Sequence, residues 1–435
     1  MELFDRPDGG ELAVLVHIRF TSALDTQDSD EFSELVASAG AEEVAFISGS
    51  KSSPVAKYFV GSGKLEEIHT AVQGAGAEVV IFNHVLSPSQ ERNIEAFLSC
   101  RVLDRTRLIL DIFAQRARTH EGKLQVELAQ LQHMATRLVR GWTHLERQKG
   151  GIGLRGPGET QLESDRRMLR GRIKQINSRL DKVRSQRGQG RRSRNRADIA
   201  TVALVGYTNA GKSTMFNQLC EAQVYVADQL FATLDPTLRR IDIPELGPIV
   251  LSDTVGFIKN LPHKLVEAFR ATLEEAANAQ LLLHVVDAAD ANRVDNIAQV
   301  EDVLVEIEAD GIPCLQVYNK IDMIVGRGPG IDYDSSGKPE RVWVSAHTGE
   351  GLALLQKAIA EVLGVDIVHK NVTIDAQHGR LRAKLYDSGG VLGESYNDAG
   401  EMKLEIRLPR HDLLRLLAAE HVDPGDLVDK DIWLN

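Results

Sequence analysis

The sequence predicts an α/β protein. Its largest domain is a doubly wound, mostly parallel sheet, with a small α/β domain and a two-helix hairpin before it and a small α+β domain after it. Short apolar runs alternate with stretches of helical spacing in the N-terminal third and again after residue 199. Two long stretches between these regions carry apolar residues at heptad spacing. A glycine-rich turn then joins one apolar run to a helix.

The first alternation occupies residues 1–120. Its expected strands and helices follow one another in the order typical of a small parallel sheet. Strands are predicted at 12–18, 43–47 and 78–82, and helices at 32–39, 64–73 and 88–98.

Residues 121–190 are expected to form an antiparallel helical hairpin. Each of two stretches has a narrow apolar seam that it cannot bury alone, so we pair them. The first seam is Leu124, Leu128, Leu131, Ala135 and Leu138, and the second is Leu162, Leu169, Ile173, Ile176, Leu180 and Val183.

The hairpin region also concentrates positive charge. The chain has a net charge of −11, yet residues 137–196 contain 18 Lys or Arg and five Asp or Glu, against 33 and 57 elsewhere. This asymmetry favours contact with a polyanion such as RNA over a merely solvated helical face. The long, glycine-rich loop at 141–158 is interpreted as a functional tip, the alternative being a floppy turn. Residues 191–198 are interpreted as a flexible basic linker. The RNA-binding candidates are Arg147, Lys149, Arg155, Arg166, Arg167 and Arg170.

The glycine-rich turn fits the phosphate-binding pattern G-x-x-x-x-G-K-[ST] at residues 206–213. Backbone N–H groups of such a loop surround phosphates, Lys212 can reach the β- and γ-phosphates, and Ser213 can offer its hydroxyl to Mg²⁺. The predicted contacts are Gly206, Tyr207, Thr208, Asn209, Ala210, Gly211, Lys212, Ser213 and Thr214.

Two further segments are expected to sense the γ-phosphate. In the first, Phe231 and Ala232 precede Thr233, which can complete the Mg²⁺ shell, with Thr237 as the second choice. In the second, Asp253 can hold Mg²⁺ through water, and Thr254 and Val255 lead to Gly256, whose N–H can reach the γ-phosphate. Lys212, Thr233 and Gly256 are the predicted catalytic residues.

Guanine recognition is predicted from Asn319, Lys320 and Asp322, with the backbone of Ser345, Ala346 and His347 reading the base carbonyl. The Asp322 carboxylate can accept two hydrogen bonds from guanine, whereas adenine would leave it unpaired. These motifs follow successive strands, as expected for a doubly wound sheet at residues 199–365. Phe257 occupies the position where a Gln would orient the attacking water, so intrinsic hydrolysis of GTP to GDP is expected to be slow.

Three segments together resemble the HflX family of GTPases. They are Gly156–Glu163, Phe231–Thr237 and Asp253–Phe257, and the likeness extends over about residues 10–435. The resemblance implies a Ras-like nucleotide domain, binding to the large ribosomal subunit and its RNA, and splitting of stalled or idle ribosomes, especially under stress. Phe257 matches the family's hydrophobic residue. Asn209 resembles the Asn that holds K⁺ in some GTPases of this lineage, and satisfying a loop N–H is the alternative.

The rest of the sequence adds few constraints. No apolar run approaches the about 20 residues of a membrane span, and the three cysteines show no paired spacing. We expect a cytoplasmic monomer that associates with ribosomes or peripherally with a membrane. Residues 366–435 are expected to form an α+β docking domain, with strands or short helices at 371–374, 384–386, 391–396 and 403–407 and a helix at 412–420.

Two other functions remain open at this point. The basic hairpin would equally serve a nucleotide-dependent remodeller or helicase acting on ribosomal RNA. Alternatively, the nucleotide domain would be a regulatory switch that binds a protein partner and has no RNA role. Steep salt dependence of binding would favour RNA over protein.

Overall fold

The computed structural model describes residues 10–20, 29–141, 157–196, 199–220, 230–244, 246–259, 273–364, 367–374, 378–396, 402–420 and 422. The chain divides into two compact units. The first extends to residue 355 without 243–246 and 333–339, and the second contains those two segments and everything from 356 onward. Within the described ranges, every helix is too short or too polar to cross a bilayer.

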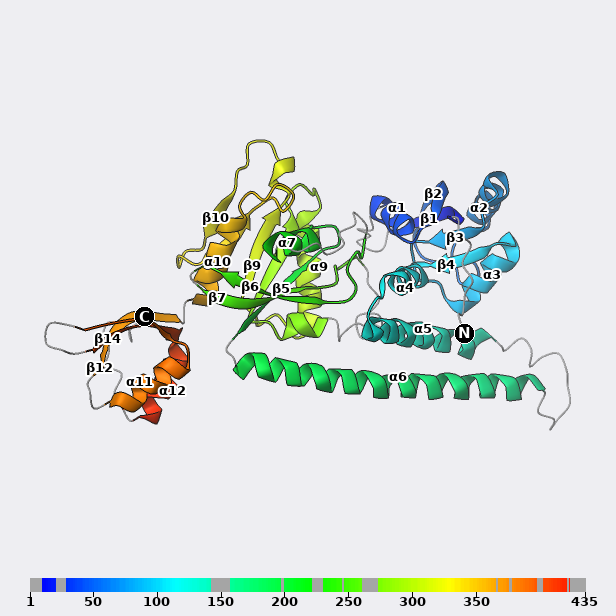
Figure 1. Cartoon of the computed structure of the whole chain (residues 1–435). Coiled ribbons are helices and arrows are strands. Elements are labelled where there is room, and N and C mark those ends of the chain that lie inside the picture. The colour runs from blue at the N-terminus through cyan, green and yellow to red at the C-terminus, as the bar shows by residue number, and fades with distance from the viewer. Residues whose placement is uncertain are drawn as a thin grey trace. The chain divides into compact units, whose positions relative to one another are not determined.

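The first unit begins with a four-stranded parallel sheet in the order β2-β1-β3-β4 (Figure 1). The predicted strands and helices of this region are all present, and β4 with α4 is an addition. The elements are β1 (Leu12–Phe20), α1 (Ser29–Ser38), β2 (Glu42–Lys51), α2 (Ser62–Ala75), β3 (Val79–Phe82), α3 (Pro88–Leu98), β4 (Arg101–Asp104) and α4 (Arg105–Arg116).

Alternation along the strands gives this sheet two apolar faces. Ala13 and Leu15 of β1 belong to a core shared with α1 and α4. Val14 and Val16 point to the other face and pack with α2 and α3. A period of two residues therefore explains why helices cover both sides.

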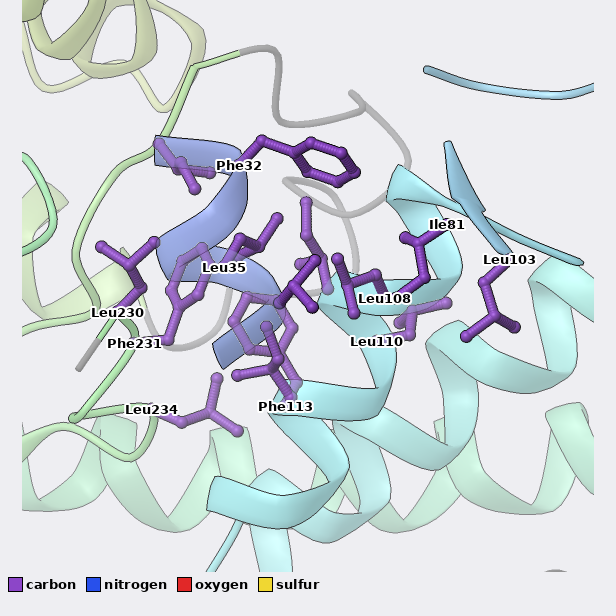
Figure 2. Packing of buried hydrophobic residues seen from close by; sticks show 14 of the residues in the cluster. Phe32, Leu35, Ile81, Leu103, Leu108, Leu110, Phe113, Leu230, Phe231 and Leu234 are labelled. Carbon is purple, nitrogen blue, oxygen red and sulfur yellow. The ribbon is translucent and has the colours of Figure 1, made fainter. Parts of the chain in front are cut away.

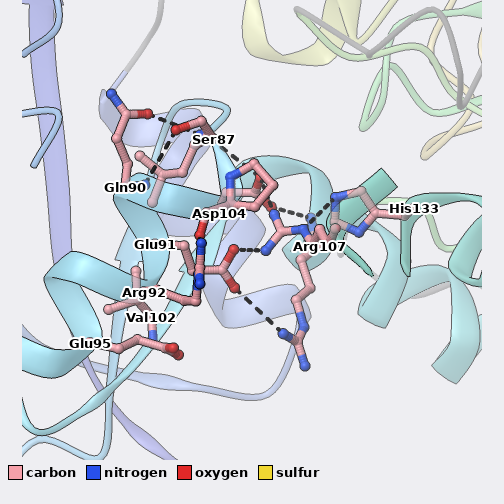
Figure 3. Close-up of polar contacts among 12 residues, drawn as sticks. Ser87, Gln90, Glu91, Arg92, Glu95, Val102, Asp104, Arg107 and His133 are labelled. Atoms are coloured by element: carbon pink, nitrogen blue, oxygen red, sulfur yellow. Dashed lines mark hydrogen bonds and ion pairs between the residues drawn. The ribbon is translucent and has the colours of Figure 1, made fainter. Parts of the chain in front are cut away.

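Side-chain caps fix the starts of α3 and α4 (Figure 3). Ser87 accepts a hydrogen bond from the Gln90 N–H, and the Gln90 side chain accepts one from the Ser87 N–H. Asp104 caps α4 by accepting from the Arg107 N–H at 2.9 Å. The same buried carboxylate accepts a hydrogen bond from Arg137 at 2.8 Å, and Arg137 also pairs with Glu91. Because Arg137 lies in the next helix, these contacts hold the hairpin against the sheet.

The hairpin consists of α5 (His120–Gly141) and α6 (Pro157–Arg196), which pack together (Figure 1). Leu124 and Leu128 of α5 form a buried cluster with Ile176 and Leu180 of α6, and Leu131 and Ile173 pack against it. The predicted seam pairing is therefore confirmed at these positions. An ion pair between Arg172 and Glu127 at 2.7 Å joins the helices beside the seam.

The expectation of a flexible linker at 191–198 is wrong for residues 191–196, because α6 continues as helix through Arg196. Arginine is a good helix former, and single glycines such as Gly188 and Gly190 cost only about 1 kcal/mol each inside a helix. Residues 197 and 198 lie outside the described ranges. Composition alone therefore underestimated the length of this helix.

The nucleotide domain has a seven-stranded sheet in the order β10-β11-β9-β8-β5-β7-β6. The pairs β11–β9, β9–β8, β8–β5 and β5–β7 are parallel, which confirms the predicted doubly wound class. Strands β6 and β10 were not predicted. The elements are β5 (Ala200–Gly206), α7 (Lys212–Cys220), β6 (Thr237–Ile243), β7 (Gly247–Asp253), β8 (Leu281–Asp287), α9 (Arg293–Glu306), β9 (Cys314–Asn319), η1 (Ile321–Met323), β10 (Gly330–Tyr333), β11 (Pro339–Trp343) and α10 (Leu352–Gly364).

The C-terminal part is a small antiparallel sheet in the order β12-β14-β13 with two helices. Its α+β class is confirmed, and residues 384–386, left open between strand and helix, lie in α11. The elements are β12 (Ile367–Ile374), α11 (Gly379–Asp387), β13 (Val391–Tyr396), β14 (Met402–Pro409) and α12 (Arg410–Ala419).

Candidate functional site

The glycine-rich loop connects the carboxyl end of β5 to the N-terminus of α7. Two glycines are sterically required. Gly206 has φ +146°, and a Cβ there would lie 2.2 Å from the Val285 carbonyl oxygen. Gly211 has φ +92°, and a Cβ there would lie 2.2 Å from Nδ2 of Asn319. The loop can therefore approach β8 and β9 only without side chains at these positions.

Asn319 connects three loops of the base-binding side. Its Nδ2 donates to the Ala210 carbonyl at 2.9 Å, and its Oδ1 accepts from the Ala346 N–H at 2.8 Å. The side chain therefore holds the phosphate loop and the 345–347 loop at fixed positions. The sequence had predicted Asn319 only as a ligand of the base, and its bracing contacts carry no local pattern.

The neighbouring residues shape the wall where guanine is predicted to bind. Lys320 has a left-handed backbone, with φ +65°, and its Nζ lies 2.7 Å from a carboxylate oxygen of Asp287. Asp322 follows in η1 and lines the same cavity as His347. Lys320, although paired with Asp287, also lines this cavity.

Lys212, the first residue of α7, is buried. Its Nζ donates to the carbonyl oxygens of Gly206 and Tyr207 at 3.0 and 2.6 Å. Burial lowers the pKa of Lys212 to about 8, although the nearby Asp253 carboxylate favours the protonated form. A buried ammonium held only by carbonyl groups is suited to an incoming anion such as a phosphate.

Three oxygen-bearing side chains meet beside Lys212. Oδ2 of Asp253 accepts from Ser213 at 2.7 Å and from Thr233 at 3.0 Å, and the two hydroxyl oxygens lie 2.7 Å apart. Oδ1 of Asp253 is buried and has no hydrogen-bond partner among the described residues. Burial raises the pKa of Asp253, opposed by the hydrogen bond from Ser213 and the charge of Lys212. A compact set of hard oxygen donors with an unsatisfied carboxylate oxygen fits Mg²⁺.

Gly256 and Phe257 have different environments. A Cβ on Gly256 would lie 2.9 Å from the Lys212 ammonium, so this position must be small. The Phe257 backbone pairs with the phosphate loop, because its carbonyl accepts from the Thr208 N–H at 2.7 Å and its N–H donates to Gly206 at 3.1 Å. Its ring is buried in the core with Leu273. A ring in that position cannot orient a water molecule.

One predicted nucleotide contact has an additional role that the sequence did not indicate. The Tyr207 hydroxyl donates to Glu31 in α1 and accepts from the Lys259 N–H at 2.8 Å. Arg105 pairs with Glu31 at 2.6 Å, and it donates to the Lys259 carbonyl at 2.9 Å. Burial and the charge of Glu31 raise the pKa of the Tyr207 hydroxyl. This buried network joins the phosphate loop to the N-terminal sheet domain.

The residues predicted to bind nucleotide surround a cavity of about 520 Å³. Sixteen of them line it: Thr208, Asn209, Gly211, Lys212, Ser213, Thr214, Phe231, Ala232, Thr233, Thr254, Gly256, Asn319, Lys320, Asp322, Ala346 and His347. Met323 is an unpredicted addition to the lining. The other six predicted residues are not among its lining residues: Gly206, Tyr207, Ala210, Asp253, Val255 and Ser345.

Comparison with known proteins decides the family. Models described as GTP-binding GTPase N-terminal, GTP-binding GTPase Middle Region and 50S ribosome-binding GTPase match residues 26–114, 116–194 and 201–320. GTPase HflX of Escherichia coli (strain K12) is 60% identical over 418 residues, which cover 96% of this chain and 98% of that protein. The chain belongs to the HflX family. GTPase HflX of Magnetococcus marinus is 45% identical, with 90% of each chain covered.

Membership of the HflX family identifies the chain as a GTP-binding protein and a GTPase, which confirms the predicted activity. Among solved structures, a complex of SsGBP with GDP is 25% identical and covers 80% of this chain and 98% of that chain. The TM-score of that comparison is 0.46.

The three RNA-binding candidates that the structure describes do not line this cavity. Arg166, Arg167 and Arg170 lie on α6, with Arg167 and Arg170 exposed and Arg166 half-buried. Arg147, Lys149 and Arg155 lie outside the described residues.

Replacing Gly211 by Ala should abolish tight binding of GTP, because the new Cβ would collide with the Asn319 amide as well as strain the backbone. Gly247→Ala is a matched control, since Gly247 has φ +93° and no atom within 4 Å of its ideal Cβ. We expect the Gly247 variant to lose about 1 kcal/mol of stability and keep its affinity for a fluorescent GTP analogue. Equal affinity in the two variants would contradict the close-approach argument.

His284 predicts a loss of stability in acid. Burial lowers the pKa of this β8 side chain from 6.5 to about 4, and Lys212 adds to the shift. Between pH 6.5 and about 4, His284 therefore binds a proton in the unfolded chain but not in the native chain. The free energy of unfolding consequently falls as the pH falls. At pH 5 this effect should reach about 2 kcal/mol relative to neutral pH. Urea unfolding at pH 7.5 and 5 measures it. His284→Gln should lose that part of the difference, whereas replacing the exposed His120 should not.

Proposed function

We propose that this HflX-family GTPase binds the large ribosomal subunit in its GTP form and splits stalled or idle ribosomes into subunits, especially under stress. The observation that carries the proposal is the set of contacts that joins the nucleotide site to the base of the basic hairpin. Both predicted γ-phosphate segments contact the N-terminal part of the chain. Asp235 binds Arg118, and the Lys259 carbonyl binds Arg105. Support for the ribosome as partner comes from the 50S ribosome-binding GTPase model that residues 201–320 match.

Within the site, Lys212 would bind the β- and γ-phosphates, and Asp322 would accept hydrogen bonds from guanine. Ser213 and Thr233 would hold Mg²⁺ directly and Asp253 through water, where the ion neutralises charge on the phosphates. The N–H of Gly256 would reach the γ-phosphate. Because Phe257 supplies no water-orienting group, intrinsic hydrolysis should be slow and stimulated by the ribosome. The loss of the γ-phosphate would then release both segments.

The hairpin would supply affinity for ribosomal RNA. Arg167 and Arg170 are exposed on one helix, as phosphate contacts require. The tip loop, with Arg147, Lys149 and Arg155, is proposed to approach the peptidyl-transferase region. In this scheme splitting draws on binding energy, and hydrolysis serves release of the factor.

Full-length protein with a non-hydrolysable GTP analogue should therefore split intact ribosomes for one round in a sucrose gradient, whereas GDP should not support splitting. Neutralising Arg166, Arg167 and Arg170 together should weaken ribosome binding and flatten its salt dependence. Neutralising Lys57, Arg239 and Arg240 is the control, since these exposed side chains lie outside the hairpin. A requirement for hydrolysis in every splitting event would refute this mechanism. Salt-independent binding that survives the hairpin variant would favour a protein partner instead.

We also propose that Asn209 holds K⁺ at the phosphates. Its backbone is left-handed, with φ +60°, and it lines the nucleotide cavity. GTP hydrolysis should then be faster in KCl than in NaCl at equal ionic strength. Asn209→Gly removes the side chain but tolerates the same backbone, so this variant should show equal rates in the two salts. Equal rates in the wild-type chain would leave Asn209 with a structural role alone.

A further inference from the structure

The segment that carries Thr233 is buried in a different domain from the site it serves. Leu230, Phe231 and Leu234 are each at most 3% exposed and belong to the apolar core formed by α1, α4 and the N-terminal sheet (Figure 2). The Phe231 ring meets Phe113 edge to face at 4.7 Å. The Leu230 N–H donates to the Ser38 hydroxyl at 3.1 Å. Packing outside the nucleotide domain therefore fixes one side of Thr233.

Asp235 fixes the other side of Thr233 at the start of α5. Its Oδ2 accepts from the N–H groups of Arg118 and Thr119 at 2.8 Å each, and its Oδ1 accepts from the Thr119 hydroxyl at 2.5 Å. Thr119 in turn accepts from the Gly122 N–H at 2.9 Å. A carboxylate at a helix N-terminus is stabilised by its free N–H groups and by the helix dipole. The two residues that precede α5 thus bind this segment directly.

Gly122 shows how close the contact is. A Cβ at Gly122 would lie 2.1 Å from Oδ1 of Asp235. Glycine in the first turns of a helix is otherwise unfavourable relative to alanine. Room for the Asp235 carboxylate is the main steric reason for glycine at this position, since the next group, the Thr119 hydroxyl, would lie 3.2 Å from that Cβ.

The backbone between these anchors is strained in a way that packing must maintain. Phe231 has φ +56°, in the left-handed region that non-glycine residues rarely adopt. Such a conformation persists where the surroundings determine it, here the Phe113 contact and the apolar core. Two residues further, the Thr233 hydroxyl lies 2.7 Å from Ser213 and 3.0 Å from Asp253. The anchors on both sides therefore position the Thr233 hydroxyl at the oxygen cluster.

We propose that Asp235 is a positioning residue for GTP hydrolysis. By binding the N-terminus of α5 it holds Thr233 beside Ser213 and Asp253, and it makes the hairpin sensitive to the nucleotide. The inference rests on the proposed magnesium role of Thr233 and is independent of ribosome binding. Since binding equilibria are reciprocal, a change at the hairpin alters Thr233 by the same coupling free energy with which the nucleotide alters the hairpin.

Gly122→Ala tests the joint from the helix side without removing any charge. Its methyl group must displace the Asp235 carboxylate, although alanine favours the helix itself. Gly171→Ala is the matched control, because Gly171 is also helical and has no atom within 4 Å of its ideal Cβ. The Mg²⁺ concentration for half-maximal GTP hydrolysis is measured with the full chain and without ribosomes. We expect about a tenfold increase for Gly122→Ala and none for Gly171→Ala.

Substitutions of Asp235 test the same joint from the other side. Asp235→Ala should match Gly122→Ala, and Asp235→Asn should fall between Ala and the wild type, since one acceptor oxygen remains. Asp242→Ala removes an exposed carboxylate as a control. Affinity for GDP without Mg²⁺ should not change in any of these variants, whereas general damage to the fold would lower it.

Thr233→Ala separates the two layers of the argument. If it raises the Mg²⁺ requirement while the Gly122 and Asp235 variants behave as the wild type, the joint has no positioning role and the proposal fails. If Thr233→Ala leaves the Mg²⁺ requirement unchanged, the proposed magnesium role of Thr233 fails, and the positioning proposal that rests on it fails with it. If Asp235→Ala does not fold, the Gly122 variant still decides, because its substitution favours the helix.

Discussion

The buried carboxylate of Asp253 is the constraint around which the nucleotide site is built. It is 1% exposed, and a bare ionised carboxylate cannot remain in such a place without donors or a cation. Ser213 brings a hydroxyl from the phosphate loop and Thr233 brings one from a loop that the sequence places 20 residues later. With Lys212 next to Ser213, two separate segments converge on the carboxylate at the end of β7. Their positions are therefore interdependent.

This convergence explains why the N-terminal sheet domain matters to a cavity that none of its residues line. The segment around Thr233 packs its apolar side chains into the N-terminal core, and the Lys259 carbonyl, just beyond Phe257, binds Arg105. Arg105 is 3% exposed and paired with Glu31, so removing either partner would leave a buried charge, at a cost of about 3–5 kcal/mol. The two γ-phosphate segments are thus bound by the same small domain.

The sequence was informative where function imposes a local pattern and silent where the fold brings distant residues together. Spacing identified the phosphate loop, the guanine motif and the apolar seam of the hairpin, because each depends on residues within one element. Asp235 and Arg105 escaped because they act 117 and 154 residues away from their partners. The segment 191–196 was misread because its content of arginine and serine suggested a flexible basic linker, while arginine favours helix.

Two adjacent residues, Asp104 and Arg105, bind the hairpin and the loop after Phe257. Asp104 binds Arg137 of α5, and the next residue, Arg105, binds the backbone of the Phe257 loop. At the other end of α5, the preceding residue Thr119 binds Asp235. A movement of the hairpin on the N-terminal sheet would therefore displace the start of α4. A movement at the base of the hairpin would displace the segment of Thr233. A rigid helix that is held at both places would pass a displacement of the hairpin to the segment of Thr233, which mobile loops could not do.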